Sequence, residues 1–156
     1  MQYDFPAMFY SDEKAVAFYF YDREDWFSFG DNVDEAILVA EEILNDSLLE
    51  LEREGKDIPA PTPLDKVVVK PLQLVKMIHA DTEQYARKLS EMNNRKAIES
   101  ADNPIKELRE RQGLSIKELS DLLNAPYRTV QDWNAGKSKP PEWVLQLILD
   151  RVLYAG

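Results

Sequence analysis

The side chains in this sequence that could do chemistry are mostly acidic, and they gather in the first half of the chain. Residues 1–65 contain 17 Asp and Glu residues against four Lys and Arg residues. Paired carboxylates can hold Mg²⁺ for the cleavage of a phosphodiester bond. The candidates near predicted strand ends are Asp4, Asp22, Asp25, Asp31 and Asp81, with His79 as a candidate general base. With so many acids chance proximity is expected and no spacing singles out a pair, so we predict no catalytic residue, no metal and no cofactor.

Other site chemistries are excluded by composition. The 156 residues contain no Cys and one His, which excludes disulfides, thiol nucleophiles and zinc sites built from Cys or from several His. Glycine-rich phosphate loops and dinucleotide fingerprints are absent. No apolar run approaches the roughly 20 residues of a membrane helix, and the first residues lack the layout of a signal peptide. A soluble cytoplasmic protein is expected.

The net charge of −10 is unevenly distributed. Residues 1–65 carry a net charge of −13, residues 66–101 carry +3, and residues 102–156 carry eight acids and eight bases. Such asymmetry indicates two modules with different partners. The acidic module should attract a cationic protein and speed its capture.

The acidic module reads as an antiparallel meander followed by a helix. Alternation predicts strands over 3–9, 15–21 and 26–29, with a turn over 22–25. Asn32 is a plausible N-cap with Glu35 three residues later, and apolar residues at helical spacing extend from Ala36 to Leu51. We expect this helix to cover one face of the sheet.

After the helix, the pattern is less regular. The proline-rich segment 58–63 predicts a loop. Residues 67–69 and 72–78 predict one or two more strands, the second of which completes the sheet. A helix begins at Asp81 or Thr82, with Tyr85, Leu89 and Met92 on its apolar side. A domain boundary is placed near residue 95, which divides the chain into 1–95 and 96–156.

The second module is helical throughout. Asn103 caps a helix with Pro104 at its first position, and Ser115 caps the next helix with Glu118 three residues on. A third helix spans 127–134 and a fourth carries Trp143, Val144, Leu147, Ile148 and Val152. The predicted fold class is therefore α+β, with an antiparallel sheet and packed helix followed by an all-α domain.

Two short helices joined by a tight turn, about residues 115–134, have the layout of a helix-turn-helix motif. The second helix presents Arg and Gln, which can bond guanine and adenine, while Val130 and Trp133 face inward. Lysines just beyond it could contact phosphates. The candidate DNA-binding residues are Ser115, Lys117, Tyr127, Arg128, Thr129, Gln131, Asp132, Lys137 and Lys139. A helical bundle used only for dimerisation is the alternative.

This local sequence closely resembles the Cro/C1-type (XRE-like) DNA-binding family. The resemblance rests on LSIKELSDLL at 114–123, YRTVQDW at 127–133 and GKSKPP at 136–141. Three positions depart from the family pattern. Ile116 stands where Gln is usual, Asn124 replaces a turn glycine, and Pro126 replaces the Ser or Thr cap. Asn tolerates the left-handed conformation that such a turn requires.

Residues 1 to about 92 resemble the HicB antitoxin family. The matching stretches are FPAMFY at 5–10, the central aromatic strand, FGDN at 29–32 with DEA at 34–36, IPAP at 58–61 and DTEQY at 81–85. The resemblance implies a partly eroded ribonuclease H-like sheet that blocks HicA, a small basic RNA-cleaving toxin. It also implies that the helix-turn-helix binds the operator of the shared operon, as a homodimer or larger homo-oligomer.

The predicted partner-binding residues lie on the aromatic strands and the acidic turn between them. They are Tyr19, Tyr21, Asp22, Glu24, Asp25 and Trp26. Half of the aromatic cluster from 18 to 29 must be core, and the other face binds either the toxin or a second copy of the sheet. The main alternative function is a stand-alone helix-turn-helix regulator whose acidic domain binds another ligand or partner. A metal-dependent nuclease is the third alternative function.

Overall fold

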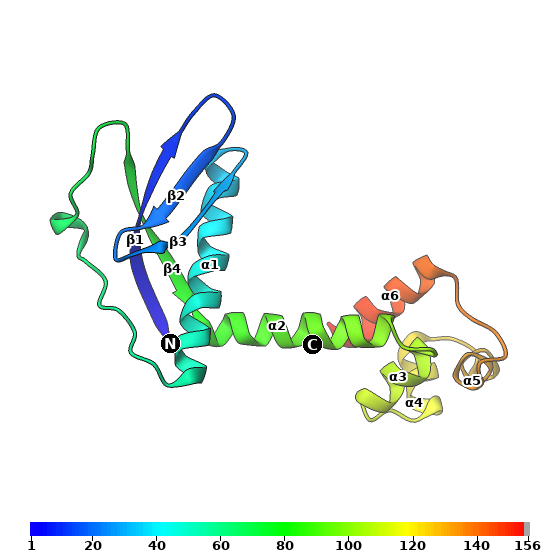
Figure 1. Ribbon diagram of the computed structural model, residues 1–156. Coiled ribbons are helices and arrows are strands. Elements are labelled where there is room, and N and C mark those ends of the chain that lie inside the picture. Colours follow the sequence, from blue (N-terminus) through cyan, green and yellow to red (C-terminus); the bar gives the residue numbers. More distant parts are fainter. Residues whose placement is uncertain (155–156) are drawn as a thin grey trace. The chain divides into compact units, whose positions relative to one another are not determined.

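The computed structural model describes residues 1–154 of the chain, which form four β-strands, six α-helices and one turn of 3₁₀ helix (Figure 1). The chain divides into two compact units, Met1–Lys88 and Leu89–Gly156. The first holds the sheet and the second holds helices, so the predicted α+β class is confirmed. No helix within residues 1–154 is long and apolar enough to cross a membrane.

The first unit is a four-stranded antiparallel sheet with a helix on one face. Its strands are β1 (Gln2–Ser11), β2 (Val16–Phe20), β3 (Arg23–Gly30) and β4 (Leu74–Asp81), in the order β3-β2-β1-β4. The helix α1 (Val33–Glu54) crosses the face that carries the aromatic core. The meander, the helix and the strand that completes the sheet are confirmed.

The core of this unit is aromatic on the strands and aliphatic on the helix. Phe5, Phe18 and Phe20 are fully or almost fully buried and face Leu44 and Leu48 of α1. The rings of Phe18 and Phe20 meet edge to face, with centroids 6.0 Å apart, the arrangement that aromatic quadrupoles favour. Period-2 alternation on the strands and a 3.6-residue period on the helix therefore meet in one apolar layer.

The N-terminus of α1 is built as the sequence predicts. Asn32 Oδ1 accepts the N–H of Glu35 at 2.9 Å, and a Glu35 carboxylate oxygen accepts the N–H of Asp31 at 2.6 Å. These bonds satisfy donors that the first helical turn leaves free. The helix ends at Gly55, whose φ of 65° is the left-handed conformation of a C-terminal glycine.

One of the two strands allowed after α1 does not form, and the turn predicted before β3 is shorter than expected. Residues 67–69 form no strand, and Val68 is 68% exposed, because an apolar triplet ahead of Pro71 finds no neighbouring strand to pair with. The segment instead follows the short 3₁₀ turn Leu64–Lys66. The turn predicted over 22–25 is also too long, since β3 already begins at Arg23.

The helix α2 (Thr82–Glu99) begins at the predicted residue and continues through residue 95. The division between the two units, at Lys88 and Leu89, therefore lies inside this helix. Ile98 is fully buried in the core of the second unit. Met92, expected on an apolar side, is half-exposed and belongs to neither core.

A polar cluster joins β1, α1 and the start of α2. Tyr3 donates its hydroxyl to a carboxylate oxygen of Glu52 at 2.6 Å, and the buried Thr82 hydroxyl donates to the same oxygen at 2.9 Å. Burial, this hydrogen bond and the Glu52 charge together raise the pKa of Tyr3 to about 12, because each disfavours the phenolate.

This shift predicts a loss of stability at high pH. The folded-state pKa of Tyr3 lies above its ordinary value of 10.0, so its contribution is complete below pH 10 and is lost as the pH rises through about 12. Urea unfolding midpoints of the full chain at about pH 9 and about pH 11 should fall less for Tyr3→Phe than for the wild type. Equal falls in the two proteins would assign the loss to other groups.

The second unit is formed by the end of α2 and four shorter helices. These are α3 (Pro104–Arg111), α4 (Ile116–Leu123), α5 (Tyr127–Ala135) and α6 (Glu142–Leu153). Its core contains Ile105, Leu108, Leu119, Val130 and Leu149. The predicted N-caps are confirmed, since Asn103 Oδ1 accepts the N–H of Lys106 and Ser115 and Glu118 form a reciprocal capping box.

Candidate protein-binding face and nucleic-acid interface

The face of the sheet turned away from α1, here called the outer face, carries aromatic rings on three neighbouring strands, with those on β1 and β3 exposed and Tyr19 of β2 half-buried. Strand pairing places Tyr10 beside Ala17 and Ala17 beside Phe29, and one step along places Tyr19 beside Phe27. Phe27 is 67% exposed, Phe29 64% and Tyr10 47%. Exposed apolar surface on adjacent strands is a mark of protein interaction sites.

A hollow of about 650 Å³ lies at one end of this face. Tyr10, Tyr19 and Phe27 form one side of it, and the segment from Lys70 to Gln73 forms the other. Gln73 Nε2 donates to the Tyr19 hydroxyl at 3.2 Å, which joins the two sides. Glu24 also lines the hollow, and it is exposed and makes no ion pair within residues 1–154.

The predicted partner-binding residues separate into three groups. Tyr19 and Glu24 line the hollow, and Tyr21 is half-buried. Asp22 is occupied inside the unit, because it accepts hydrogen bonds from the Thr62 N–H and hydroxyl and so fastens the proline-rich loop. Asp25 accepts both a 2.9 Å and a 2.7 Å bond from the Arg23 guanidinium, which keeps the pKa of Asp25 low.

Trp26 corrects the prediction, since it is 8% exposed and lies in the core. Its ring meets Phe20 edge to face, and the Arg23 guanidinium lies 4.6 Å from its centroid. The exposed rings of β3 are instead Phe27 and Phe29, which belong to the aromatic cluster 18–29 but not to the predicted partner-binding residues. In the structure Gly30 lies against the first turn of α1, and period-2 alternation places Trp26 on the same side of β3.

The first unit is acidic, but many of its acids lie away from the outer face. Met1–Lys88 contains 19 Asp and Glu residues and nine Lys and Arg residues, for a net charge of −10. Many of the acids are on the exposed side of α1, across the sheet from the outer face, namely Glu41, Glu42, Asp46, Glu50 and Glu54. The field of this unit thus attracts a cationic partner at long range, while apolar contact is available on the outer face.

The candidate acids and the candidate base do not assemble into a metal site. Asp4 and His79 do meet, with Asp4 Oδ1 2.9 Å from His79 Nδ1 across β1 and β4, but both side chains are more than half exposed. Asp81 caps α2 by accepting the Gln84 N–H at 3.1 Å, which lowers the pKa of Asp81. Within residues 1–154 no three Asp, Glu or His side chains are arranged to hold a metal ion.

In the second unit, α4 and α5 are joined by residues 124–126 in the predicted order. Asn124 takes the left-handed conformation, with φ 50° and ψ 41°, and its N–H returns to the Asp121 carbonyl. Asn therefore does what the turn glycine would do. Pro126 starts α5 without a side-chain cap, so the N-terminus of this helix has free N–H groups.

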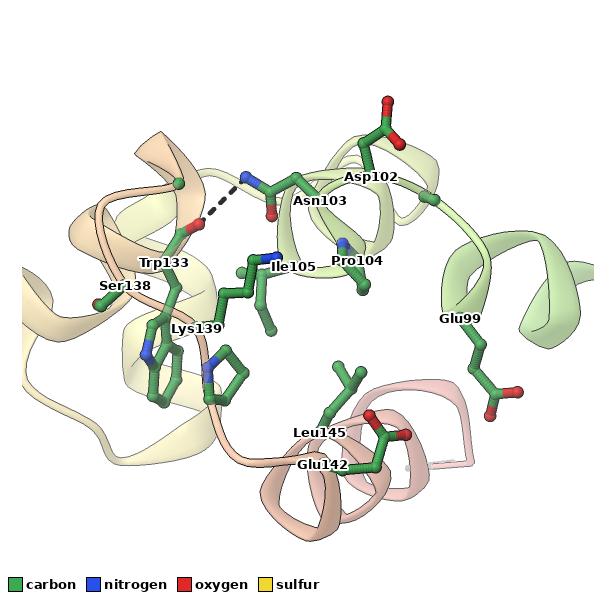
Figure 2. A pocket seen from close by; sticks show the side chains of 13 residues that line it. Glu99, Asp102, Asn103, Pro104, Ile105, Trp133, Ser138, Lys139, Glu142 and Leu145 are labelled. Carbon is green, nitrogen blue, oxygen red and sulfur yellow. Dashed lines mark hydrogen bonds between the residues drawn. The ribbon is translucent and has the colours of Figure 1, made fainter.

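Two side chains hold the C-terminus of α5. They are Asn103, which is the N-cap of α3, and Arg109, which lies on α3. Asn103 Nδ2 donates to the Trp133 carbonyl at 3.1 Å (Figure 2) and to the Asn134 carbonyl at 2.9 Å, while its Oδ1 caps α3. Arg109 donates to Asn134 Oδ1 at 2.9 Å and to the Leu114 carbonyl at 3.0 Å. Neither tertiary role was predicted, because only the helix-start pattern around Asn103 is visible in the sequence.

These bonds lead to a prediction about Asn103. In Asn103→Asp the carboxylate can still cap α3 but cannot donate to the α5 carbonyls, whereas Asn103→Ala loses both functions. A cap is worth about 1 kcal/mol, and a lost buried hydrogen bond costs about 1–3 kcal/mol. Both variants should unfold the second unit at a lower urea concentration than the wild type does. Peptide-resolved hydrogen exchange of the full chain over a series of urea concentrations measures this midpoint for the second unit. Wild-type protection in Asn103→Asp would show that the α5 bonds contribute nothing.

The predicted DNA-binding residues are not equally available. Tyr127, Arg128 and Gln131 are exposed on α5, and spacings of four and three residues make Gln131 a surface neighbour of both Tyr127 and Arg128. Arg128 lies 3.3 Å from Asp132, and Lys117 lies 2.8 Å from Asp121. Thr129 and Asp132 are half-buried, the Ser115 hydroxyl caps α4, and Lys137 is exposed.

Lys139 lines a cavity of about 240 Å³ beside the end of α5 (Figure 2). Trp133, Ile105 and Leu145 are apolar residues of its lining, and Glu99, Asp102 and Glu142 are also among the residues that line it.

No protein-family model and no curated protein matches the chain. Among solved structures it is similar to a toxin–antitoxin complex from Streptococcus pneumoniae, with 18% identity and a TM-score of 0.49 over 88% of this chain and 100% of that one. The N-terminal domain of Burkholderia pseudomallei antitoxin HicB shares 20% identity, with a TM-score of 0.45 over 49% of this chain and 95% of that one. A HicA3 and HicB3 toxin–antitoxin complex shares 19%, with a TM-score of 0.43 over 51% and 99%.

Proposed function

We propose that this chain is a HicB-like antitoxin. Its first unit binds and neutralises a small basic HicA-like RNA-cleaving toxin, and its helical unit binds operator DNA and represses the operon. In this role the chain holds its partners and needs no catalytic residue, metal or cofactor.

The observation that carries the proposal is the outer face of the sheet. Phe27, Phe29 and Tyr10 expose about half or more of their surface in a unit with a net charge of −10. Aromatic rings on rigid strands supply contact area at low entropic cost, and the surrounding negative charge favours a cationic protein over nucleic acid. A basic RNA-cleaving enzyme combines both requirements.

The proposal predicts a gene for a small basic toxin beside the gene of this chain, and growth rescue with that toxin tests it. Cells that express this toxin should grow when the wild-type chain is co-expressed and should stop growing with the double variant Phe27→Ser and Phe29→Ser. Leu38→Gln is the matched control, because Leu38 is 65% exposed but lies on α1. Full rescue by the double variant would contradict the assignment of the outer face, provided that the variants accumulate to equal levels.

The operator function rests on the exposed side of α5. Arg128 can bond guanine bidentately, a contact worth about 1–3 kcal/mol of base discrimination. Arg128→Ala should therefore weaken binding to DNA from upstream of the gene about 10-fold or more, in a shift assay at fixed salt. Arg111→Ala is the control, since Arg111 is exposed on α3, is ion-paired with Glu107 as Arg128 is with Asp132, and is not among the candidate DNA-binding residues. Unchanged affinity and specificity would remove Arg128 from the base-reading residues.

We propose that the chain acts as a homodimer, because helix-turn-helix proteins usually read two half-sites. On α6, Trp143 is 69% exposed and Leu147 is 58% exposed, so this helix has apolar surface beyond what its own core uses.

A stand-alone transcriptional regulator is the second candidate. The observation that favours it is the hollow of about 650 Å³ on the outer face, which is within the range of small-molecule sites. Operator binding that persists while no neighbouring toxin binds would select this function.

A further inference from the structure

The turn before β4 has an unusual residue at its tip. Gln73 donates its N–H to the Lys70 carbonyl at 3.2 Å, and the Lys70 N–H returns to Gln73 Oε1 at 3.3 Å. Pro71 is at the second position of this four-residue turn, where proline is favoured. Leu72 is at the third position with a φ of +66°, where a type II turn prefers glycine.

No packing within the described residues compensates for the backbone strain at Leu72. Leu72 is 98% exposed, so its side chain gains no packing within the unit. In the left-handed region a branched, apolar side chain is strained, because its Cβ crowds the backbone. The turn thus combines unfavourable backbone geometry with unfavourable exposure, and a glycine would avoid both.

The tip is nevertheless held firmly in one place. Its residues form one side of the hollow on the outer face, opposite Tyr10, Tyr19 and Phe27. Gln73 donates to the Tyr19 hydroxyl as well as closing the turn. Leu72 is therefore presented, on a short and bonded turn, beside the exposed rings.

We propose that Leu72 is an anchor residue of the protein-binding face and inserts into an apolar pocket of the partner. The inference rests on the proposed function and adds a residue to it. Charge indicates the kind of pocket: the unit carries a net charge of −10 and Glu24 beside the hollow has no ion-pair partner within residues 1–154. The partner is a basic protein whose pocket is bordered by Lys or Arg side chains.

The test separates binding from folding, because the two should move in opposite directions. In the full-length chain, Leu72→Gly should leave the urea midpoint equal to or above that of the wild type, since glycine suits the positive φ. Its affinity for the purified HicA-like protein encoded beside this gene should fall about 10-fold or more in a calorimetric titration.

Two further variants complete the test. Leu72→Met keeps a flexible apolar side chain and should bind within about threefold of the wild type. Leu38→Ala removes an exposed leucine from α1, away from the outer face, and should bind the HicA-like protein as tightly as the wild type does. If the wild-type chain binds but Leu72→Gly binds equally well, Leu72 is not an anchor. If the wild-type chain itself fails to bind, the proposed antitoxin function falls and the inference falls with it.

Discussion

Replacing Gly30 by alanine should destabilise the first unit by about 3 kcal/mol. A Cβ at this position would be 2.5 Å from the Ala36 nitrogen and 2.9 Å from both the Ala36 Cα and the Glu35 carbonyl carbon. All three are backbone atoms in the first turn of α1, so no side chain can rotate away. The helix would have to separate from the end of β3, which would open the aromatic core.

Peptide-resolved hydrogen exchange on the full chain measures this effect in each unit separately. Peptides from β3 and α1 should lose protection in Gly30→Ala, while those from α4 and α5 keep it. Ser28→Ala is the control, since it changes a neighbouring residue of the same strand without adding a carbon to the close contact. Wild-type protection in Gly30→Ala would mean that the helix and sheet are less closely packed than the structure indicates. Because Phe27 and Phe29 are on the same strand, toxin binding should be lost together with protection.

Replacing Ile98 by alanine should destabilise the second unit by about 2–5 kcal/mol. Ile98 is near the end of α2, is fully buried, and packs in the core with Ile105, Leu108 and Leu149. Removing three carbons from a filled core loses their burial and leaves a cavity that the surrounding helices can only partly close.

Met92→Ala is a matched control on the same helix. Met92 is 51% exposed and in neither core, so its loss should change stability by less than about 0.5 kcal/mol. Urea unfolding followed by hydrogen exchange of α3 to α6 peptides would distinguish the two variants. Equal stability of Ile98→Ala and wild type would contradict the assignment of the end of α2 to the helical unit.

Arg95 supports the same assignment. Its guanidinium bonds Glu99 on its own helix and Asp150 and Gln146 on α6, at 2.6 to 3.0 Å. Hydrogen bonds to Asp150, Tyr154 and Glu99 raise the pKa of Arg95 above its usual range. The residues around 95, which read as a polar boundary in the sequence, thus bind α6 and belong to the second unit.

Local patterns predicted the elements well. The start of α1 follows from Asn32 and Glu35, and the starts of α3 and α4 follow from Asn103 and Ser115, because capping bonds join residues within one helical turn. The apolar period of α1 and the alternation of β2 also set which residues are buried. Each of these signals depends on neighbours in the chain, so it can be read without the fold.

Where two faces of a strand, or a strand and a loop, fit the same local pattern, the sequence could not decide between them. Trp26 and Phe27 alternate equally well on either face of β3, and only the close contact of Gly30 with α1 decides that Trp26 is inside. Val68 has the composition of a strand residue, but a strand also requires a neighbour to pair with. The extent of the helical unit likewise depends on contacts of Ile98 and Arg95 with residues more than fifty positions away.

The sequence by itself determined the two modules, their different charge, the positions of most helices and strands, and the side chains on α5 that could meet DNA. These properties are set by composition and by hydrogen bonds between near neighbours. Only the tertiary structure decided that Phe27 and Phe29 form the exposed face, that Asn103 and Arg109 hold the end of α5, and that Leu72 stands strained and exposed beside the hollow. Each of these three features depends on contacts between residues that are far apart in the chain. The packing of the whole unit sets those contacts.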